Sequence, residues 1–89
     1  MIILLDGSKM KTREKAHEYI KQKLNFPDYY GMNLDALWDM LTTIVVDDLI
    51  LYNKKAMLDN LGEHGEILIE TFKEAAEENR NMKFRILNV

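Results

Sequence analysis

The chain has 89 residues, of which 47% are hydrophobic and 30% charged, with a formal net charge of −3. This balance excludes a disordered chain and predicts one small domain over residues 1–89. The absence of cysteine excludes a disulfide framework and a thiolate nucleophile. The longest apolar runs, such as residues 1–5, are much shorter than the roughly 20 residues of a membrane-spanning helix. We therefore predict no membrane association, no signal peptide and a cytoplasmic protein.

The charge is distributed unevenly along the chain. Residues 1–23 sum to +3, residues 24–53 sum to −5 and contain no Lys, Arg or His, and residues 54–89 sum to −1. A long block of one sign is unusual on a solvated surface, although chance clustering in a short chain is the alternative. Such a block repels nucleic-acid phosphates and attracts a basic partner, so we expect no direct binding of nucleic acid.

The first half of the chain predicts a strand followed by two helices. Residues 1–5 are typical of a buried strand, which a turn at residues 6–8 follows. Thr12 is placed to cap a helix, which Pro27 ends. A loop with aromatic side chains that we expect to be exposed comes next, and Asn33 caps a second helix. The apolar face of this second helix consists of Leu34, Leu37, Trp38 and Leu41.

The second half of the chain repeats this pattern. Asp47-Asp48 predict a turn, and residues 49–52 predict a second buried strand. Asn53 is placed to cap a third helix that Gly62 stops. A fourth helix is expected from residues 65–66 onward, with Ile67 among its inward residues, and residues 82–89 predict a third strand. Strands separated by helices form parallel sheets, so the order predicts a two-layer α/β fold with a three-stranded parallel sheet and four helices.

Two acidic side chains on the second predicted helix are the sharpest candidates for function. Asp35 and Asp39 are spaced i, i+4 and share a face, which opposes helix formation by a few tenths of a kcal/mol, about 0.2–0.5. Trp38 lies beside them, and Tyr29-Tyr30 precede the helix. Aromatic residues beside fixed acids are typical of a protein-binding site. The alternative is that Trp38 and one of the two tyrosines belong to the core, and we expect Trp38 to be partly core. Catalytic or metal-binding roles for the two acids are weaker alternatives, because an exposed helix face offers neither a cleft nor enough ligands.

Other patterns that could indicate chemistry are incomplete. Gly7-Ser8-Lys9 follows a strand but lacks the leading glycine of a phosphate-binding loop. His17 and His64 have no evident partner, so we expect both on the solvated surface. Met32 lies in the aromatic loop and could contact a partner. No catalytic residue, metal or cofactor is predicted.

Residues 24–41, LNFPDYYGMNLDALWDML, closely resemble the signature segment of the barstar family. Residues 72–75, FKEA, resemble that family's acidic motif in the fourth helix, and the resemblance covers essentially the whole chain. It implies a barstar-like fold and an intracellular inhibitor that blocks the active site of a barnase-like, extracellular-type basic ribonuclease, with no enzyme activity and a monomeric free state.

The resemblance also implies roles for individual residues. Asp39 would occupy the position of a substrate phosphate, Tyr29 would lie against the catalytic groups, Asp35 would meet a second basic side chain and Glu74 would add a peripheral acid. The full set of expected partner-binding residues is Tyr29, Tyr30, Gly31, Asn33, Leu34, Asp35, Trp38, Asp39, Thr42, Thr43, Ile44 and Glu74. The chain departs from the family pattern at Met32, at Thr43-Ile44, where a second interface Trp is missing, and at Val46.

Two other classes of function remain open from the sequence. The first is a regulatory module of the same fold whose acidic surface binds a basic partner that is not a ribonuclease. The second is a nucleic-acid binder that uses the basic residues Lys9, Lys11, Arg13 and Lys15, although no aromatic residue lies between them.

Overall fold

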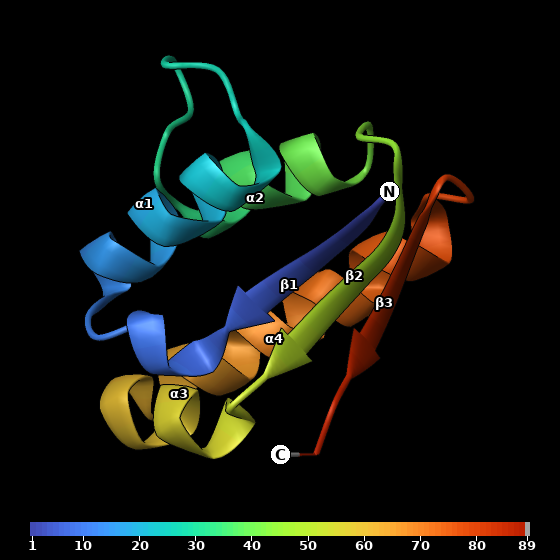
Figure 1. Ribbon diagram of the computed structural model, residues 1–89. Helices are drawn as coiled ribbons and strands as arrows, with labels where there is room; N and C mark the ends of the chain where they lie inside the picture. Colours follow the sequence, from blue (N-terminus) through green and yellow to red (C-terminus); the bar gives the residue numbers. More distant parts are fainter. Residues whose placement is uncertain (89) are drawn as a thin grey trace.

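The computed structural model describes residues 1–88 and contains one parallel sheet (Figure 1). Its strands are β1 (Ile2–Asp6), β2 (Val46–Tyr52) and β3 (Met82–Ile86), and they lie in the order β1-β2-β3. Leu4 of β1 is in register with Ile50 of β2, and Leu51 of β2 with Ile86 of β3. The third strand is shorter than predicted, and Val89 lies outside the described residues.

Two pairs of helices connect the strands. Helices α1 (Arg13–Leu24) and α2 (Leu34–Leu41) lie between β1 and β2, and helices α3 (Lys54–Leu61) and α4 (Glu63–Glu78) lie between β2 and β3. A short 3-10 helix, η1 (Gly7–Lys9), follows β1 at the predicted turn. The predicted fold class, with its parallel sheet, four helices and element order, is therefore confirmed.

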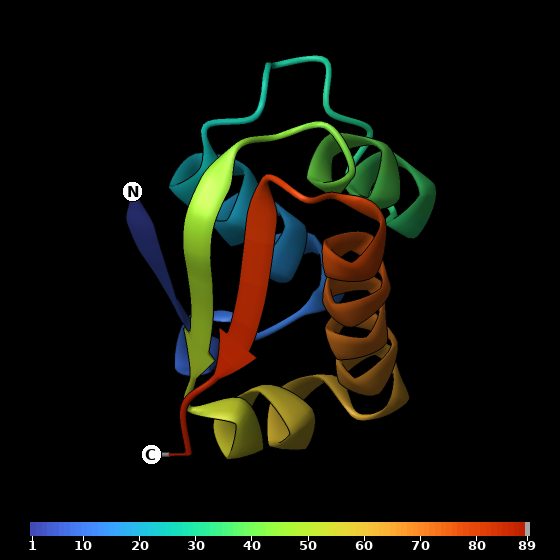
Figure 2. The same cartoon turned by 90° about the vertical axis from the view of Figure 1, so that its right-hand side faces the viewer.

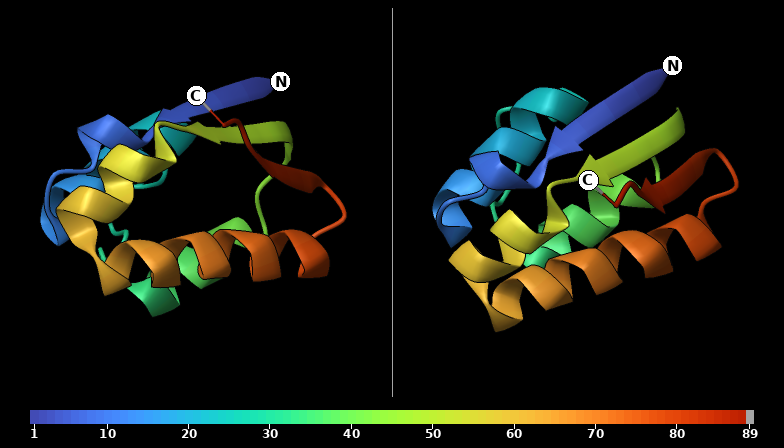
Figure 3. Two further views of the ribbon diagram at one scale, coloured as in Figure 1. Left: turned by 90° about the horizontal axis from the view of Figure 1, so that it is seen from below. Right: turned by 60° about the horizontal axis from the view of Figure 1, so that its bottom comes forward.

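The helices cover one face of the sheet. Helices α2 and α4 lie beneath the strands, and α1 lies beside β1 (Figure 3). Helix α4 is long and runs beside the sheet next to β3 (Figure 2). In β1, Leu5 points into the core, whereas Ile2 and Leu4 are exposed on the opposite face, over which no helix of residues 1–88 lies.

The core between the sheet and the helices contains side chains from both the strands and the helices. Leu5, Ile20, Leu37, Leu51 and Phe72 are all fully buried, and they come from β1, α1, α2, β2 and α4. Burial of a side chain of this size contributes roughly 1.5–3 kcal/mol to folding. The core therefore fixes α2, which carries the predicted binding residues, against the rest of the molecule.

Side-chain caps set the helix boundaries of the first half. Thr12 Oγ1 accepts a hydrogen bond from Lys15 N at 3.1 Å, as its position predicts. Helix α1 ends at Leu24, shortly before Pro27, where Asn25 adopts a left-handed conformation with φ of 55°. At the start of α2, Asn33 Oδ1 accepts a hydrogen bond from Ala36 N at 2.8 Å, so this predicted cap is confirmed.

The turn predicted at Asp47-Asp48 is wrong. Both residues belong to β2, at an irregularity in its pairing with β3 between Val46 and Leu49. Such a bulge accommodates an extra residue and lets polar side chains stay in a strand. Asp47 pairs with the amino group of Met1, and Asp48 pairs with Arg85 of β3 at 3.6 Å.

The second helical pair also differs from the prediction in detail. Asn53 precedes α3 but makes no side-chain cap; its φ is 55°, and its Nδ2 donates a hydrogen bond to Asp6 Oδ1 at 2.8 Å. Gly62 stops α3 as predicted, with φ of 58°, and α4 begins directly after it at Glu63 rather than at Gly65. Ile67 is 40% exposed instead of inward, because the buried face of α4 is formed by residues such as Leu68 and Phe72, and Ile67 lies outside it.

Candidate functional site

Helix α2 presents the two predicted aspartates to solvent. Asp35 and Asp39 are both exposed, whereas Leu37 and Leu41 of the same helix are fully buried. The buried leucines fix the rotation of the helix, so the carboxylates stay on the outer face. Asp35 also lies in the first turn, where the positive end of the helix dipole favours a negative charge.

The charges of Asp35 and Asp39 are not neutralised within the part of the chain that the structure describes. Four ion pairs occur among residues 1–88, and they join Met1 to Asp47, Lys21 to Asp28, Lys55 to Asp59 and Arg85 to Asp48. None of them includes an acid of α2. The outer face of α2 is therefore available to an external cation.

Hydrogen bonds fix the carboxyl end of α2. The hydroxyl groups of Thr42 and Thr43 donate to the carbonyl oxygen of Asp39 at 3.2 and 3.1 Å. Asn79, which is buried at the end of α4, donates through Nδ2 to the carbonyl oxygens of Leu41 and Ile44 at 2.9 and 2.8 Å. A helix of eight residues is thereby held in one position, which limits the entropy that Asp39 would lose on binding.

The loop before α2 separates its two tyrosines. Tyr29 is 81% exposed, as predicted, but Tyr30 is only 5% exposed. The Tyr30 hydroxyl lies 2.7 Å from His17 Nδ1, and its ring packs against Phe26 with a centroid distance of 4.9 Å. The expectation that the aromatic side chains of this loop are exposed is therefore wrong for Tyr30 and for Phe26, which is 6% exposed, and the alternative of one buried tyrosine holds. Burial raises the pKa of the Tyr30 hydroxyl.

Most of the remaining predicted residues lie in the loop before α2, in α2 and in the segment that follows it. Gly31 and Asn33 are exposed in the loop, and Asn33 Nδ2 donates to the Gly31 carbonyl at 3.1 Å. Leu34 and Trp38 are half-buried and pack against the core, which confirms the expectation that Trp38 is partly core. Thr43 is exposed, whereas Thr42 and Ile44 are half-buried.

Helix α4 carries a further acid that the family resemblance includes in the binding surface. The two helices pack against each other, and Glu74 on α4 is exposed. We use the name acidic patch for Asp35, Asp39 and Glu74 together with Tyr29 and Trp38. It contains acids from two helices, one exposed aromatic side chain and one that is half-buried.

The predicted surface position of both histidines is wrong. His17 is 3% exposed and His64 is 8% exposed, and their ring centroids are 5.8 Å apart. Burial lowers the pKa of both, and the pKa values fall further because His17 faces His64 and His64 faces Arg13. A periodic signal was present: His17 lies beside Ala16 on the apolar face of α1, and His64 precedes Leu68 by one turn.

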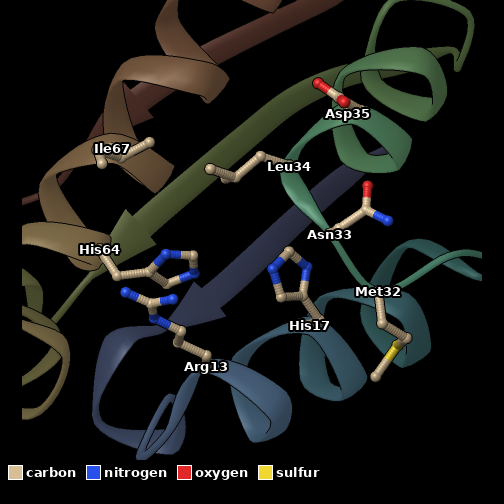
Figure 4. Close-up of a pocket in the computed structure, with 8 residues that line it drawn as sticks. All are labelled: Arg13, His17, Met32, Asn33, Leu34, Asp35, His64 and Ile67. Carbon is tan, nitrogen blue, oxygen red and sulfur yellow. The ribbon is translucent and has the colours of Figure 1, made fainter.

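A cavity lies beside the acidic patch, between α1, the loop, α2 and α4 (Figure 4). It has a volume of about 540 Å³. Residues 33–35 line one side of it, and Arg13, His17 and His64 line the other. The sequence-based prediction included residues 33–35 among the binding residues but did not place Arg13, His17 and His64 beside them.

Two other classes of site find little support. Among residues 1–88, no group of three or more His, Cys, Asp or Glu side chains is placed to hold a metal ion. In the same range, no helix is long and apolar enough to span a membrane. The structure is that of a small α/β protein whose helix α2 exposes two aspartates that form no ion pair among residues 1–88.

Comparison with known proteins shows which family the chain belongs to. The family model for Barstar (barnase inhibitor) matches residues 1–88, and the chain belongs to this family. The chain is also 42% identical over 87 residues to the protein named "Putative ribonuclease inhibitor YrdF" from Bacillus subtilis (strain 168). That alignment covers 96% of this chain and 94% of the relative.

Proposed function

We propose that the protein inhibits a barnase-type ribonuclease by placing the acidic patch in the cationic active site of the enzyme. The observation that carries the proposal is the pair Asp35 and Asp39, exposed on one face of α2 and included in none of the ion pairs among residues 1–88. Membership of an inhibitor family supports the same role and a function without catalysis.

The physical basis is mimicry of RNA by fixed carboxylates. A ribonuclease concentrates positive charge in its active site to hold phosphate groups, and an anionic surface of matching shape is attracted to the same charges. Thr42, Thr43 and Asn79 hold the backbone at the end of α2 that carries Asp39, so little backbone freedom is lost on binding. Complementary charge also accelerates encounter.

Individual roles follow from the family resemblance together with the positions described above. We assign Asp39 to the phosphate position, Asp35 to a second basic side chain and Tyr29 to the catalytic groups, with Glu74 at the periphery. The other surface contacts are Gly31, Asn33, Leu34, Trp38, Thr42, Thr43 and Ile44. Tyr30 acts differently: its buried hydroxyl fixes the loop to His17, so it positions Tyr29 rather than meeting the partner with its ring.

A titration of ribonuclease activity tests this function. A fixed concentration of a barnase-type enzyme cleaves a fluorogenic RNA while the protein is added in increasing amounts. The expected result is a linear loss of activity that ends at one-to-one stoichiometry. Unchanged cleavage in the presence of excess protein contradicts the proposal. Such a result, together with binding of a different basic protein through the same patch, would establish the alternative regulatory module.

A further inference from the structure

Two buried imidazoles, those of His17 and His64, pack against each other on one side of the cavity next to the acidic patch, with ring centroids 5.8 Å apart. In Figure 4, the rings of His17 and His64 point toward one another, and the guanidinium group of Arg13 lies beside His64. His17 comes from α1 and His64 from the first turn of α4, so two packed elements hold the pair in place. Neither ring is needed for the proposed contacts of Asp35 and Asp39.

One nitrogen in this cavity has no partner. Among residues 1–88, the Nε2 of His64 is the one buried side-chain nitrogen or oxygen that makes no hydrogen bond. His64 as a whole is 8% exposed, and leaving such a polar atom unpaired is unfavourable. The unpaired nitrogen indicates a ligand that completes the site.

The charges around the cavity determine whether a cationic or an anionic ligand is favoured there. Arg13 carries a permanent positive charge and belongs to none of the ion pairs among residues 1–88. Asp35 also lines the cavity, but its carboxylate points away from Arg13 (Figure 4). The permanent charge beside His64 is therefore positive, and it favours a ligand that is a hydrogen-bond acceptor with negative charge.

We propose that Arg13, His17 and His64 form a binding site for a carboxylate, supplied by an Asp or Glu side chain of the protein partner. The guanidinium group can bind a carboxylate through two parallel hydrogen bonds, and the Nε2–H of His64 can donate a third. When the Tyr30 hydroxyl donates to His17 Nδ1, the ring proton of His17 lies on Nε2, which is also free to donate. The identification of the partner as a ribonuclease rests on the proposed function. The carboxylate site itself does not depend on that function.

This site makes the binding surface bipolar. Asp35 and Asp39 attract cations, and the cavity beside Asp35 accepts an anion, so a partner must present one acidic side chain next to its basic cavity. The titratable and charged groups that face the site are Arg13 and His17 of α1, Tyr30 of the loop, Asp35 of α2 and His64 of α4. A bound carboxylate stabilises protonated imidazole, so binding takes up protons.

Titration with acetate tests the site in the isolated protein. The imidazole carbon-bound proton signals of His17 and His64 are followed by NMR while sodium acetate replaces sodium chloride at constant ionic strength, at about pH 6.5. We expect saturable shifts of both residues and a rise in their pKa values. Arg13→Gln should weaken acetate binding about tenfold, because it removes a charged, two-point contact. Lys15→Gln, which removes the same charge from an exposed position of α1 outside the cavity, should weaken it less than about twofold.

Equal responses to acetate and chloride, or equal losses in Arg13→Gln and Lys15→Gln, would overturn the carboxylate site. A second arm measures binding of a barnase-type ribonuclease to the same variants, with the larger loss expected for Arg13→Gln. If acetate binds as expected but wild-type protein does not bind the nuclease, the proposed function fails and the site stands. If the nuclease binds tightly but acetate leaves both histidines unchanged, the site fails and the proposed function stands.

Discussion

The Tyr30 hydroxyl lies 2.7 Å from His17 Nδ1, in the interior of the molecule, and joins the loop before α2 to helix α1. Tyr30→Phe removes the hydroxyl but keeps the ring, so it leaves a buried imidazole nitrogen unpaired. We expect a loss of about 1–3 kcal/mol in the free energy of unfolding, measured by urea denaturation. Tyr29→Phe is the matched control: its hydroxyl is exposed, and the change should stay within about 0.5 kcal/mol. Equal stability of the two variants would show that the buried bond contributes nothing.

The buried histidines make stability depend on pH. Because burial lowers the pKa of His17 and His64 in the folded protein, the unfolded chain binds protons more readily. Stability is therefore fully present above the unfolded value of 6.5 and falls as the pH drops below it toward the lower folded values. Urea denaturation between about pH 8 and about pH 5.5 should show this loss. The double variant His17→Gln/His64→Gln should lose most of the dependence, and an unchanged slope would contradict the assignment to these two rings.

Asn79 connects the carboxyl end of α2 to the turn before β3. Its Nδ2 donates to two carbonyl oxygens, and its Oδ1 accepts from Asn81 N at 2.9 Å. Asn79→Ala leaves these buried groups without partners, so we expect a loss of about 2 kcal/mol or more in unfolding free energy. Asn81→Ala, at an exposed position, keeps its backbone bond and should change stability by less than about 0.5 kcal/mol. Similar losses in both variants would rule out a special role for the Asn79 side chain.

Helices and strands whose boundaries depend on local caps, turns and apolar periodicity were predictable from the sequence. The Asn33 cap and the buried Leu37 and Leu41 determine where α2 begins and which face it exposes, so Asp35 and Asp39 could be placed without coordinates. The order of strands and helices followed from apolar periodicity and turns for the same reason. Local sequence patterns were therefore sufficient to predict the position of the two acids on α2 and most of the fold.

Contacts between distant segments account for what the sequence did not reveal. Asp47 lies in β2 because a bulge and the amino group of Met1 accommodate it, and neither is visible in the local sequence. Tyr29 and Tyr30 are chemically alike, and only the position of His17 on another element decides which one is buried. The local sequence predicts a surface position for His64 because the ring that packs against it, His17, is 47 positions away in the chain (64 − 17).

Electrostatic attraction should control the rate of association with the nuclease. The uncompensated charges of Asp35 and Asp39 act over distance, and salt screens them with a Debye length of about 10 Å at 0.1 M. We expect the association rate measured by stopped-flow fluorescence to fall steeply as the salt concentration rises, with a much smaller change in the dissociation rate. An association rate that does not respond to salt would exclude steering by the acidic patch.

The dissociation constant of Asp39→Ala with a barnase-type ribonuclease tests the central claim most directly. The account predicts an increase of about 30-fold or more over wild type, as expected of a binding hot spot worth about 2 kcal/mol or greater. Glu74→Ala should give a clearly smaller loss. Asp59→Ala, on α3 at the opposite end of the molecule from α2, should leave binding unchanged. Equal, small changes in all three variants would contradict a binding site centred on Asp39.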